Sequence, residues 1–313
     1  MMKIVQKVLI FIIFTKSCVG FAPPKFDPET DVYFLLRIQN REFNKEEAVN
    51  LAQKEGLEKT AFDPSKPILF HVHGFIEDRK KPTHLLLDKT ILEKADMNLF
   101  FVDWGKGAKT IDYGLARSRV DGVSKVIGEF INYINAKHGL SPSNSCCIGF
   151  SLGAHICGLI HVYVTDGKLN KVYGLDPAGL LFDVNDPSTR ISPDSASYVE
   201  CIHTGFPLGI RSAICQTDFF VNKGTSQPGC SNLLNKDNFA CSHNRAIQFF
   251  MEAIKTPNSF YGKLCSSQEN AMLGNCEDEP GAFMVGKENR EKQLTGIYHV
   301  ITNDKVPFGR GKE

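Results

Sequence analysis

The chain has 313 residues, with 36 lysines and arginines against 35 aspartates and glutamates, and a formal net charge of +1. This balance excludes the strongly basic character of a nucleic-acid-binding protein and gives no electrostatic reason to expect an acidic partner. Residues 21–313 are long enough for one large α/β domain, and no repeat or low-complexity linker divides them.

The first twenty residues have the pattern of a secretory signal peptide. Two lysines begin the segment, an apolar run covers residues 8–14, and small residues at 18–20 precede a cut at Phe21. The apolar run is too short to cross a membrane. We therefore expect a secreted, extracellular protein without a transmembrane segment.

Nine of the ten cysteines follow this leader, and secretion makes disulfide bonds feasible for them. An odd number leaves at least one free thiol. No Cys-x-x-Cys pair is present, which argues against a zinc site. Six cysteines fall into three close pairs: Cys201 with Cys215, Cys230 with Cys241, and Cys265 with Cys276. The other three, expected in the core of a strand and a helix, are Cys146, Cys147 and Cys157.

Strands and helices alternate along the chain. Strands are predicted at residues 31–38, 68–72, 98–102, 145–148, 172–175 and 198–203, and helices at 46–54, 120–134, 152–163 and 246–254. This alternation predicts an α/β fold with a mostly parallel central sheet and helices on both faces. Functional side chains are then expected just beyond the carboxyl ends of the strands.

The central motif is Gly-Phe-Ser-Leu-Gly at residues 149–153, placed where a buried strand turns into a helix. This is the context of a nucleophile elbow, in which a strained turn lifts the serine hydroxyl above the sheet. The helix N-terminus favours developing negative charge there. The alternative interpretation is an ordinary tight strand–helix junction. We predict Ser151 as the nucleophile.

A serine hydroxyl needs a base, and the base needs an acid that holds its tautomer. Asp176 follows the next predicted strand, and His243 stands at the N-terminus of the helix at 246–254. The order Ser, Asp, His is that of α/β-hydrolases. The predicted triad is therefore Ser151, Asp176 and His243. Its rivals are Asp183, Asp186 and Asp194 for the acid, and His155 and His203 for the base.

Two backbone N–H groups are predicted to hold the oxyanion of the tetrahedral intermediate. One belongs to Leu152, the residue after the nucleophile, and the other to Phe75, in the loop after the strand at 68–72. Gly74 allows a close approach of the backbone. His71 and His73 are expected to be structural, and the alternative for this segment is a plain strand-to-loop turn.

These motifs resemble those of the pancreatic-type lipase family. The matching segments occur in the family's order and span nearly all of the chain after the leader: residues 62–67, 73–75, 102–104, 149–155, 174–179, 202–204, 227–230 and 241–245. The resemblance implies an α/β-hydrolase domain. The family's serine, aspartate and histidine fall on the three residues named above.

Three departures from the family pattern carry expectations. Phe150 replaces the usual histidine before the nucleophile, and its side chain is expected under the turn. The family's C-terminal β-sandwich is expected to be absent, and with it the docking surface for a colipase-type helper. Arg190 matches the family's calcium loop, but carboxylates are replaced by Pro187, Ser192 and Ser195. Calcium requires several carboxylate oxygens, so no metal or cofactor is predicted.

In this family the lid lies between two disulfide-bonded cysteines, which correspond to Cys230 and Cys241. In this chain the segment between them is short. A short lid and a short loop at 205–214 resemble arthropod venom phospholipases A1. The resemblance implies release of the sn-1 fatty acid from phospholipid; the alternatives are a triacylglycerol or galactolipid lipase and a non-catalytic, yolk-protein-like relative. A lipid-contacting apolar rim is predicted from Phe206, Pro207, Leu208, Ile210, Leu233, Leu234 and Phe239.

Overall fold

The computed structural model describes residues 25–41, 47–230, 238–277 and 280–312. All the strands of these residues belong to one sheet with the order β10-β9-β11-β8-β7-β6-β5-β3-β4-β1-β2. The strands are β1 Tyr33–Arg37, β2 Glu47–Val49, β3 Ile68–Val72, β4 Asn98–Asp103, β5 Ser145–Phe150, β6 Lys171–Leu175, β7 Val199–His203, β8 Thr217–Val221, β9 Tyr261–Cys265, β10 Gly281–Phe283 and β11 Gly296–Val300. The predicted leader at 1–20 lies outside the described residues.

The middle of the sheet is parallel. Strands β4, β3, β5, β6, β7, β8 and β11 follow one another with parallel pairing, while β1, β2, β9 and β10 complete the edges in antiparallel pairs. Every residue of β3, β7 and β8 is buried. Continuous buried runs are typical of parallel strands covered on both faces.

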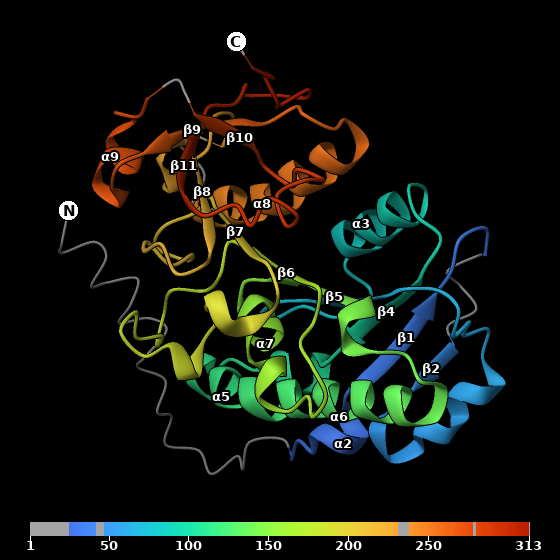
Figure 1. Cartoon of the computed structure of the whole chain (residues 1–313). Coiled ribbons are helices and arrows are strands. Elements are labelled where there is room, and N and C mark those ends of the chain that lie inside the picture. The colour runs from blue at the N-terminus through green and yellow to red at the C-terminus, as the bar shows by residue number, and fades with distance from the viewer. Residues whose placement is uncertain (1–24, 42–46, 231–237, 278–279, 313) are drawn as a thin grey trace, which may run out of the picture.

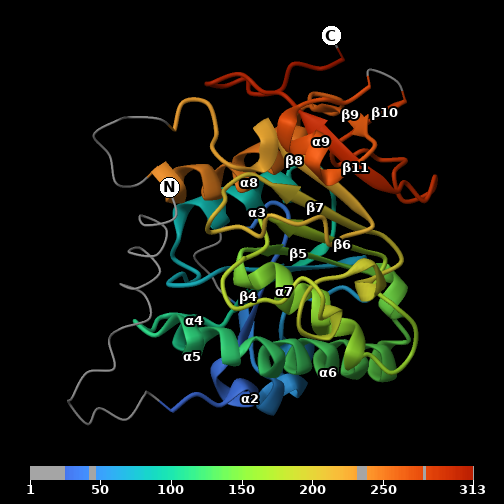
Figure 2. The same ribbon diagram turned by 90° about the vertical axis from the view of Figure 1, so that its left-hand side faces the viewer.

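Helices cover both faces of the sheet, as Figures 1 and 2 show. One apolar core joins the sheet to α6 and α7, and a second joins it to α3 and α8. The α-helices are α2 Pro28–Asp31, α3 Pro82–Leu92, α4 Gly105–Ala108, α5 Tyr113–Ser118, α6 Val120–His138, α7 Leu152–Leu159, α8 Asn238–Lys255 and α9 Gln268–Leu273. The predicted mostly parallel α/β sheet is confirmed.

The long helix α6 shows how its sequence determines its packing. Its predicted apolar face, from Val120 to Ile134, is buried against the sheet. Gly139 ends the helix in the left-handed conformation with φ 68°, which glycine adopts without a steric penalty.

Several predicted elements differ from the structure. The segment expected as a helix at 46–54 is the short strand β2 followed by a 3-10 helix, Leu51–Lys59, because β2 pairs with β1 at the sheet edge. The predictions did not include α3, β8, β9 or β10. Helix α8 begins at Asn238, so His243 lies in its second turn and not at its N-terminus.

Four disulfide bonds cross-link the described residues. They are Cys147–Cys157, Cys201–Cys215, Cys230–Cys241 and Cys265–Cys276. The first joins two cysteines that were expected in the core without a bond between them, so that expectation was incomplete. Among the described residues, Cys146 is the free cysteine. In the part of the chain that the structure describes, no helix is long and apolar enough to span a bilayer.

Candidate active site

Ser151 lies at the sharp junction between β5 and α7. Its backbone has φ 57° and ψ −117°. This conformation is energetically unfavourable for any residue that has a side chain. A Cβ atom on Gly149 would lie 2.1 Å from the carbonyl oxygen of Gly153, and one on Gly153 would lie 2.2 Å from that of Val72. Only glycine fits at either position, because the strand and the helix approach each other so closely.

Asp176 follows β6 directly and is buried. Its Oδ2 lies 2.5 Å from Nδ1 of His243. Its Oδ1 accepts the backbone N–H groups of Thr204, at 2.7 Å, and Gly205, at 3.2 Å. Both oxygens of the carboxylate are therefore engaged, and the one that faces the imidazole has a fixed direction.

His243 reaches this edge from α8 and is 93% shielded from solvent, with 7% of its surface exposed. The ring of Phe150 lies 4.5 Å from the imidazole, centroid to centroid. The Ser151 backbone flanks the same place, because its N–H donates to the Leu175 carbonyl and its own carbonyl accepts from Ala178. Among the described residues, no hydrogen bond joins Ser151 Oγ to His243; such bonds often tighten only when substrate is bound.

The two predicted oxyanion donors border Ser151. A Cβ atom on Gly74 would lie 2.9 Å from the Ser151 Cβ, so the loop after β3 passes directly beside Ser151. Within the described residues, neither the Phe75 N–H nor the Leu152 N–H has a hydrogen-bond acceptor. Both amides are therefore available to an incoming oxygen.

His73 holds the peptide that carries the Phe75 N–H. The Trp104 backbone N–H donates to His73 Nε2 at 3.2 Å, so the ring proton is assigned to Nδ1, which donates to the Gly74 carbonyl at 2.9 Å. In a trans peptide the N–H points opposite to the C=O. The anchored Gly74 carbonyl therefore fixes the direction of the Phe75 N–H.

The rival residues lie in other networks. His155 is buried beneath the elbow, with Nε2 donating to the Ala178 carbonyl and Nδ1 accepting from Ile191. Burial lowers its pKa to about 3. His203 bonds Asp218 at 2.8 Å. The three rival aspartates lie in the loop between β6 and β7, where Asp183 and Asp186 accept N–H groups of their own turns.

The loop that matches the family's calcium site is organised around Arg190. Its guanidinium donates to the carbonyl oxygens of Asp183, Val184 and Ile191. In the described part of the chain, one group of three metal-ligand side chains comes together, Cys201, Cys215 and Asp218, but its two cysteines form a disulfide bond.

The predicted apolar rim differs from the exposed apolar surface. Ile210 is buried, because the loop folds back on Pro177, while Phe206, Pro207 and Leu208 are half-buried. Leu233 and Leu234 lie outside the described residues, and Phe239 is exposed. The most exposed apolar side chains in the loops around Phe75 were not predicted: Ile76, Ile111 and Leu181.

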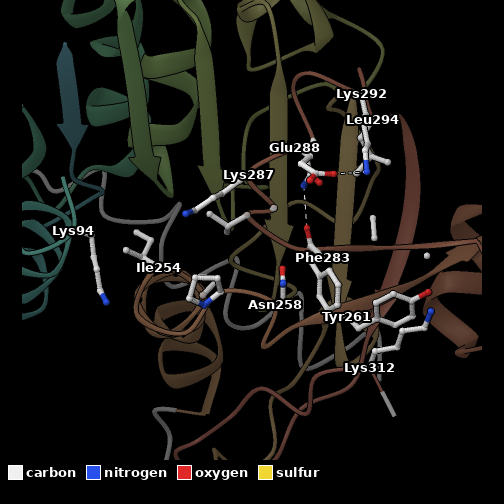
Figure 3. Close-up of a pocket in the computed structure, with 17 residues that line it drawn as sticks. Lys94, Ile254, Asn258, Tyr261, Phe283, Lys287, Glu288, Lys292, Leu294 and Lys312 are labelled. Carbon is white, nitrogen blue, oxygen red and sulfur yellow. Dashed lines mark hydrogen bonds and ion pairs between the residues drawn. The ribbon is translucent and has the colours of Figure 1, made fainter.

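A pocket of about 920 Å³ lies elsewhere, beside the C-terminal end of α8, β9 and β10 (Figure 3). Lys94, Lys287 and Lys312 reach its rim, and Glu288 pairs with Lys292. None of its lining residues belongs to the predicted site.

The parallel sheet, the strained serine after β5 and the carboxylate–imidazole pair at the same edge define an α/β-hydrolase architecture. The family model described as Lipase matches residues 18–308. The chain therefore belongs to the Lipase family.

Its relatives include proteins from wasps and mammals. "Probable phospholipase A1 magnifin" of Vespa magnifica is 34% identical over 79% of this chain and 76% of that protein. A "Phospholipase A1" of Vespula squamosa is 30% identical over 92% of this chain and 97% of its own length. "Lipase member H" of Rattus norvegicus is 34% identical over 68% of this chain and 48% of its own length.

Proposed function

We propose that the protein is a secreted phospholipase A1 that hydrolyses the sn-1 ester of phosphatidylcholine-type phospholipids. The observation that carries the proposal is the 2.5 Å contact between Asp176 and His243 at the edge where Ser151 stands on a strained turn. Ser151 is the nucleophile, His243 the base and Asp176 the residue that holds the tautomer of His243.

The chemistry proceeds by acyl transfer. His243 Nε2 takes the proton of Ser151 as its Oγ attacks the ester carbonyl, while Asp176 holds the proton on Nδ1. The N–H groups of Phe75 and Leu152 bind the resulting oxyanion. His243 then gives its proton to the departing lysophospholipid oxygen, and water activated by His243 releases the fatty acid from Ser151.

The choice of phospholipid is supported by the relatives and by the lid segment. Relatives at 30–36% identity carry the name phospholipase A1. The cysteines that bound the lid segment, Cys230 and Cys241, are only 11 positions apart. An open site lets a phosphate headgroup stay hydrated, which avoids the cost of burying a charge. The alternative substrate is a triacylglycerol or galactolipid.

The lipid surface is met by an apolar patch formed by Ile76, Ile111 and Leu181. Their side chains are 59%, 82% and 54% exposed. The Ile76 N–H donates to the Ala108 carbonyl. The ring of Phe75 contacts that of Tyr113, whose hydroxyl donates to the Leu180 carbonyl, so the loops adjoin one another near Phe75. Exposed apolar side chains grouped beside a site favour contact with a lipid surface.

Extracellular location is supported by the four disulfide bonds, which persist in oxidising compartments. A non-catalytic storage role is the competing function. The retained serine on a strained elbow, with a paired imidazole beside it, favours the enzyme.

The test uses phosphatidylcholine with different acyl chains at sn-1 and sn-2, assayed beside a triglyceride emulsion. We expect release of the sn-1 acid, with Ser151→Ala slower by at least about 10⁴-fold and no longer labelled by a serine-directed phosphonate. Dominant triglyceride turnover would contradict the phospholipase assignment. Equal labelling of wild type and Ser151→Ala would contradict the enzyme assignment.

A further inference from the structure

A continuous chain of buried polar side chains runs from the sheet to the loop beside Ser151. Asp88 on α3 contacts Arg37 on β1, and its other oxygen lies 2.5 Å from Nδ1 of His71 on β3. His71 Nε2 lies 3.1 Å from Nδ1 of His84, and His84 Nε2 lies 2.9 Å from Oε2 of Glu77. All five side chains are at least 95% shielded from solvent, with 5% or less of each residue exposed.

The bonds of this chain assign its protons. The carboxylates of Asp88 and Glu77 accept, so His71 Nδ1 and His84 Nε2 each carry a proton. Burial lowers the pKa of His84 to about 4, although Glu77 opposes this shift, so His84 is neutral.

The chain ends on a carboxylate that touches the oxyanion loop. Burial alone would raise the pKa of Glu77, but its bonds with His84, Lys81 and the Gly74 N–H outweigh burial and hold the pKa well below its usual range. Glu77 Oε2 accepts the Gly74 N–H at 2.9 Å, and Oε1 lies 3.0 Å from Lys81 Nζ. Glu77 is therefore ionised and fixed from three directions.

The contact with Gly74 bridges a strained turn. Between Gly74 and Glu77, Ile76 has φ 58°, which is costly for a β-branched residue. The Glu77 carboxylate closes this turn from its far end. His73 holds the Gly74 carbonyl and Glu77 holds the Gly74 N–H, so both polar groups of Gly74 are anchored. The Phe75 N–H follows immediately.

We propose that Glu77 is a positioning residue for the oxyanion hole: its carboxylate, held by His84 and Lys81, fixes the Gly74 amide and thereby aims the Phe75 N–H at the oxyanion. The inference rests on the proposed function. Glu77 does not touch substrate and acts only through the loop. Its loss is expected to impair the transition state more than substrate binding, because the oxyanion exists only in the transition state and the intermediate.

The experiment compares Glu77→Gln and Glu77→Ala with wild type on a soluble ester. Glutamine keeps one acceptor oxygen for Gly74 and His84 but loses the charge and the second oxygen that pairs with Lys81; alanine keeps neither oxygen. We expect kcat to fall about 10-fold for Glu77→Gln and about 100-fold for Glu77→Ala, with KM within about 2-fold. The inhibition constant of a trifluoromethyl ketone, whose adduct carries an oxyanion, should rise in step with the loss of kcat.

The matched control is Glu200→Gln, which also removes a buried carboxylate that accepts a backbone N–H, that of Val285 at 2.7 Å. It should lower Tm and leave kcat unchanged. If folded Glu77→Gln kept wild-type kcat and inhibitor affinity, the inference would be wrong. If wild type itself showed no ester hydrolysis, the proposed function would fail instead.

A second pair of variants covers the case in which Glu77 variants do not fold. Lys81→Met removes a partly exposed partner of Glu77, while Lys80→Met removes an exposed neighbour. We expect kcat to fall about 3-fold in the first and to stay unchanged in the second, since only Lys81 orients the carboxylate. Equal kcat in the two variants would overturn the role of Glu77.

Discussion

Phe150, next to Ser151, contributes packing and no proton. Its side chain is buried in the core between the sheet and α8, and its ring contacts the imidazole of His243. The residue that precedes Ser151 therefore packs against the side chain of His243. Gly149 matters because it lacks a side chain: its α-carbon faces the backbone of α7 across the elbow, where a Cβ atom would not fit.

Gly149→Ala is expected to destabilise the protein by more than about 3 kcal/mol, or to prevent folding, because the added methyl would meet the backbone of Gly153. Urea unfolding followed by circular dichroism measures the loss. Gly56→Ala is the control, since its Cβ would meet only a side-chain atom of Val49 at 3.4 Å. Similar stability losses in both variants would contradict the steric explanation.

At the scale of the elements, β5 and α7 are joined twice across the elbow. The chain connects them through Ser151, and the disulfide bond Cys147–Cys157 connects them again beneath it. Both cysteines are fully buried in the core that α6 and α7 form with the sheet. The cross-link therefore fixes the angle between the strand that ends beside Ser151 and the helix that begins at Leu152.

The variant Cys147→Ala/Cys157→Ala should unfold with a free energy lower by about 3 kcal/mol, because the reduced chain regains loop entropy. Tm and urea midpoints measure this change.

A thiol titration of wild-type protein, comprising residues 21–313 and denatured without a reducing agent, should find one free thiol, that of Cys146. Three thiols in wild type would show that the Cys147–Cys157 bond does not form.

The stability of the whole molecule depends on pH through buried histidines that are neutral in the folded state. Burial lowers the pKa of His155 to about 3 and that of His299 to about 4. In the unfolded chain both would titrate near 6.5. Below that pH the unfolded state binds more protons than the folded state, so the free energy of unfolding falls as the pH falls.

We expect His155 to contribute a loss of about 1.4 kcal/mol for each pH unit between pH 6.5 and its folded pKa of about 3. In His155→Gln the free energy of unfolding should be lower at pH 7 but should fall less steeply between pH 6 and pH 4. Urea titrations at each pH provide the comparison. Parallel pH curves for wild type and variant would show that His155 titrates normally in the folded protein.

The sequence determined the alternation of strands and helices, the elbow and the positions of its polar side chains, because these depend on local periodicity and on residues next to one another. Ser151, Asp176 and His243 could be chosen because each follows or precedes a recognisable element. The start of α8 could not be located, because the helix extends into the segment before Cys241.

Only the tertiary structure decided which distant side chains meet. Nothing local in the sequence links Glu77 to His84, His71 and Asp88, or Cys147 to Cys157, because these contacts arise where strands and helices pack. The exposed side chains of Ile76, Ile111 and Leu181 likewise come from three separate loops. The local sequence pattern determined the helices, the strands and the candidate triad. Packing across the sheet decided which side chains contact one another.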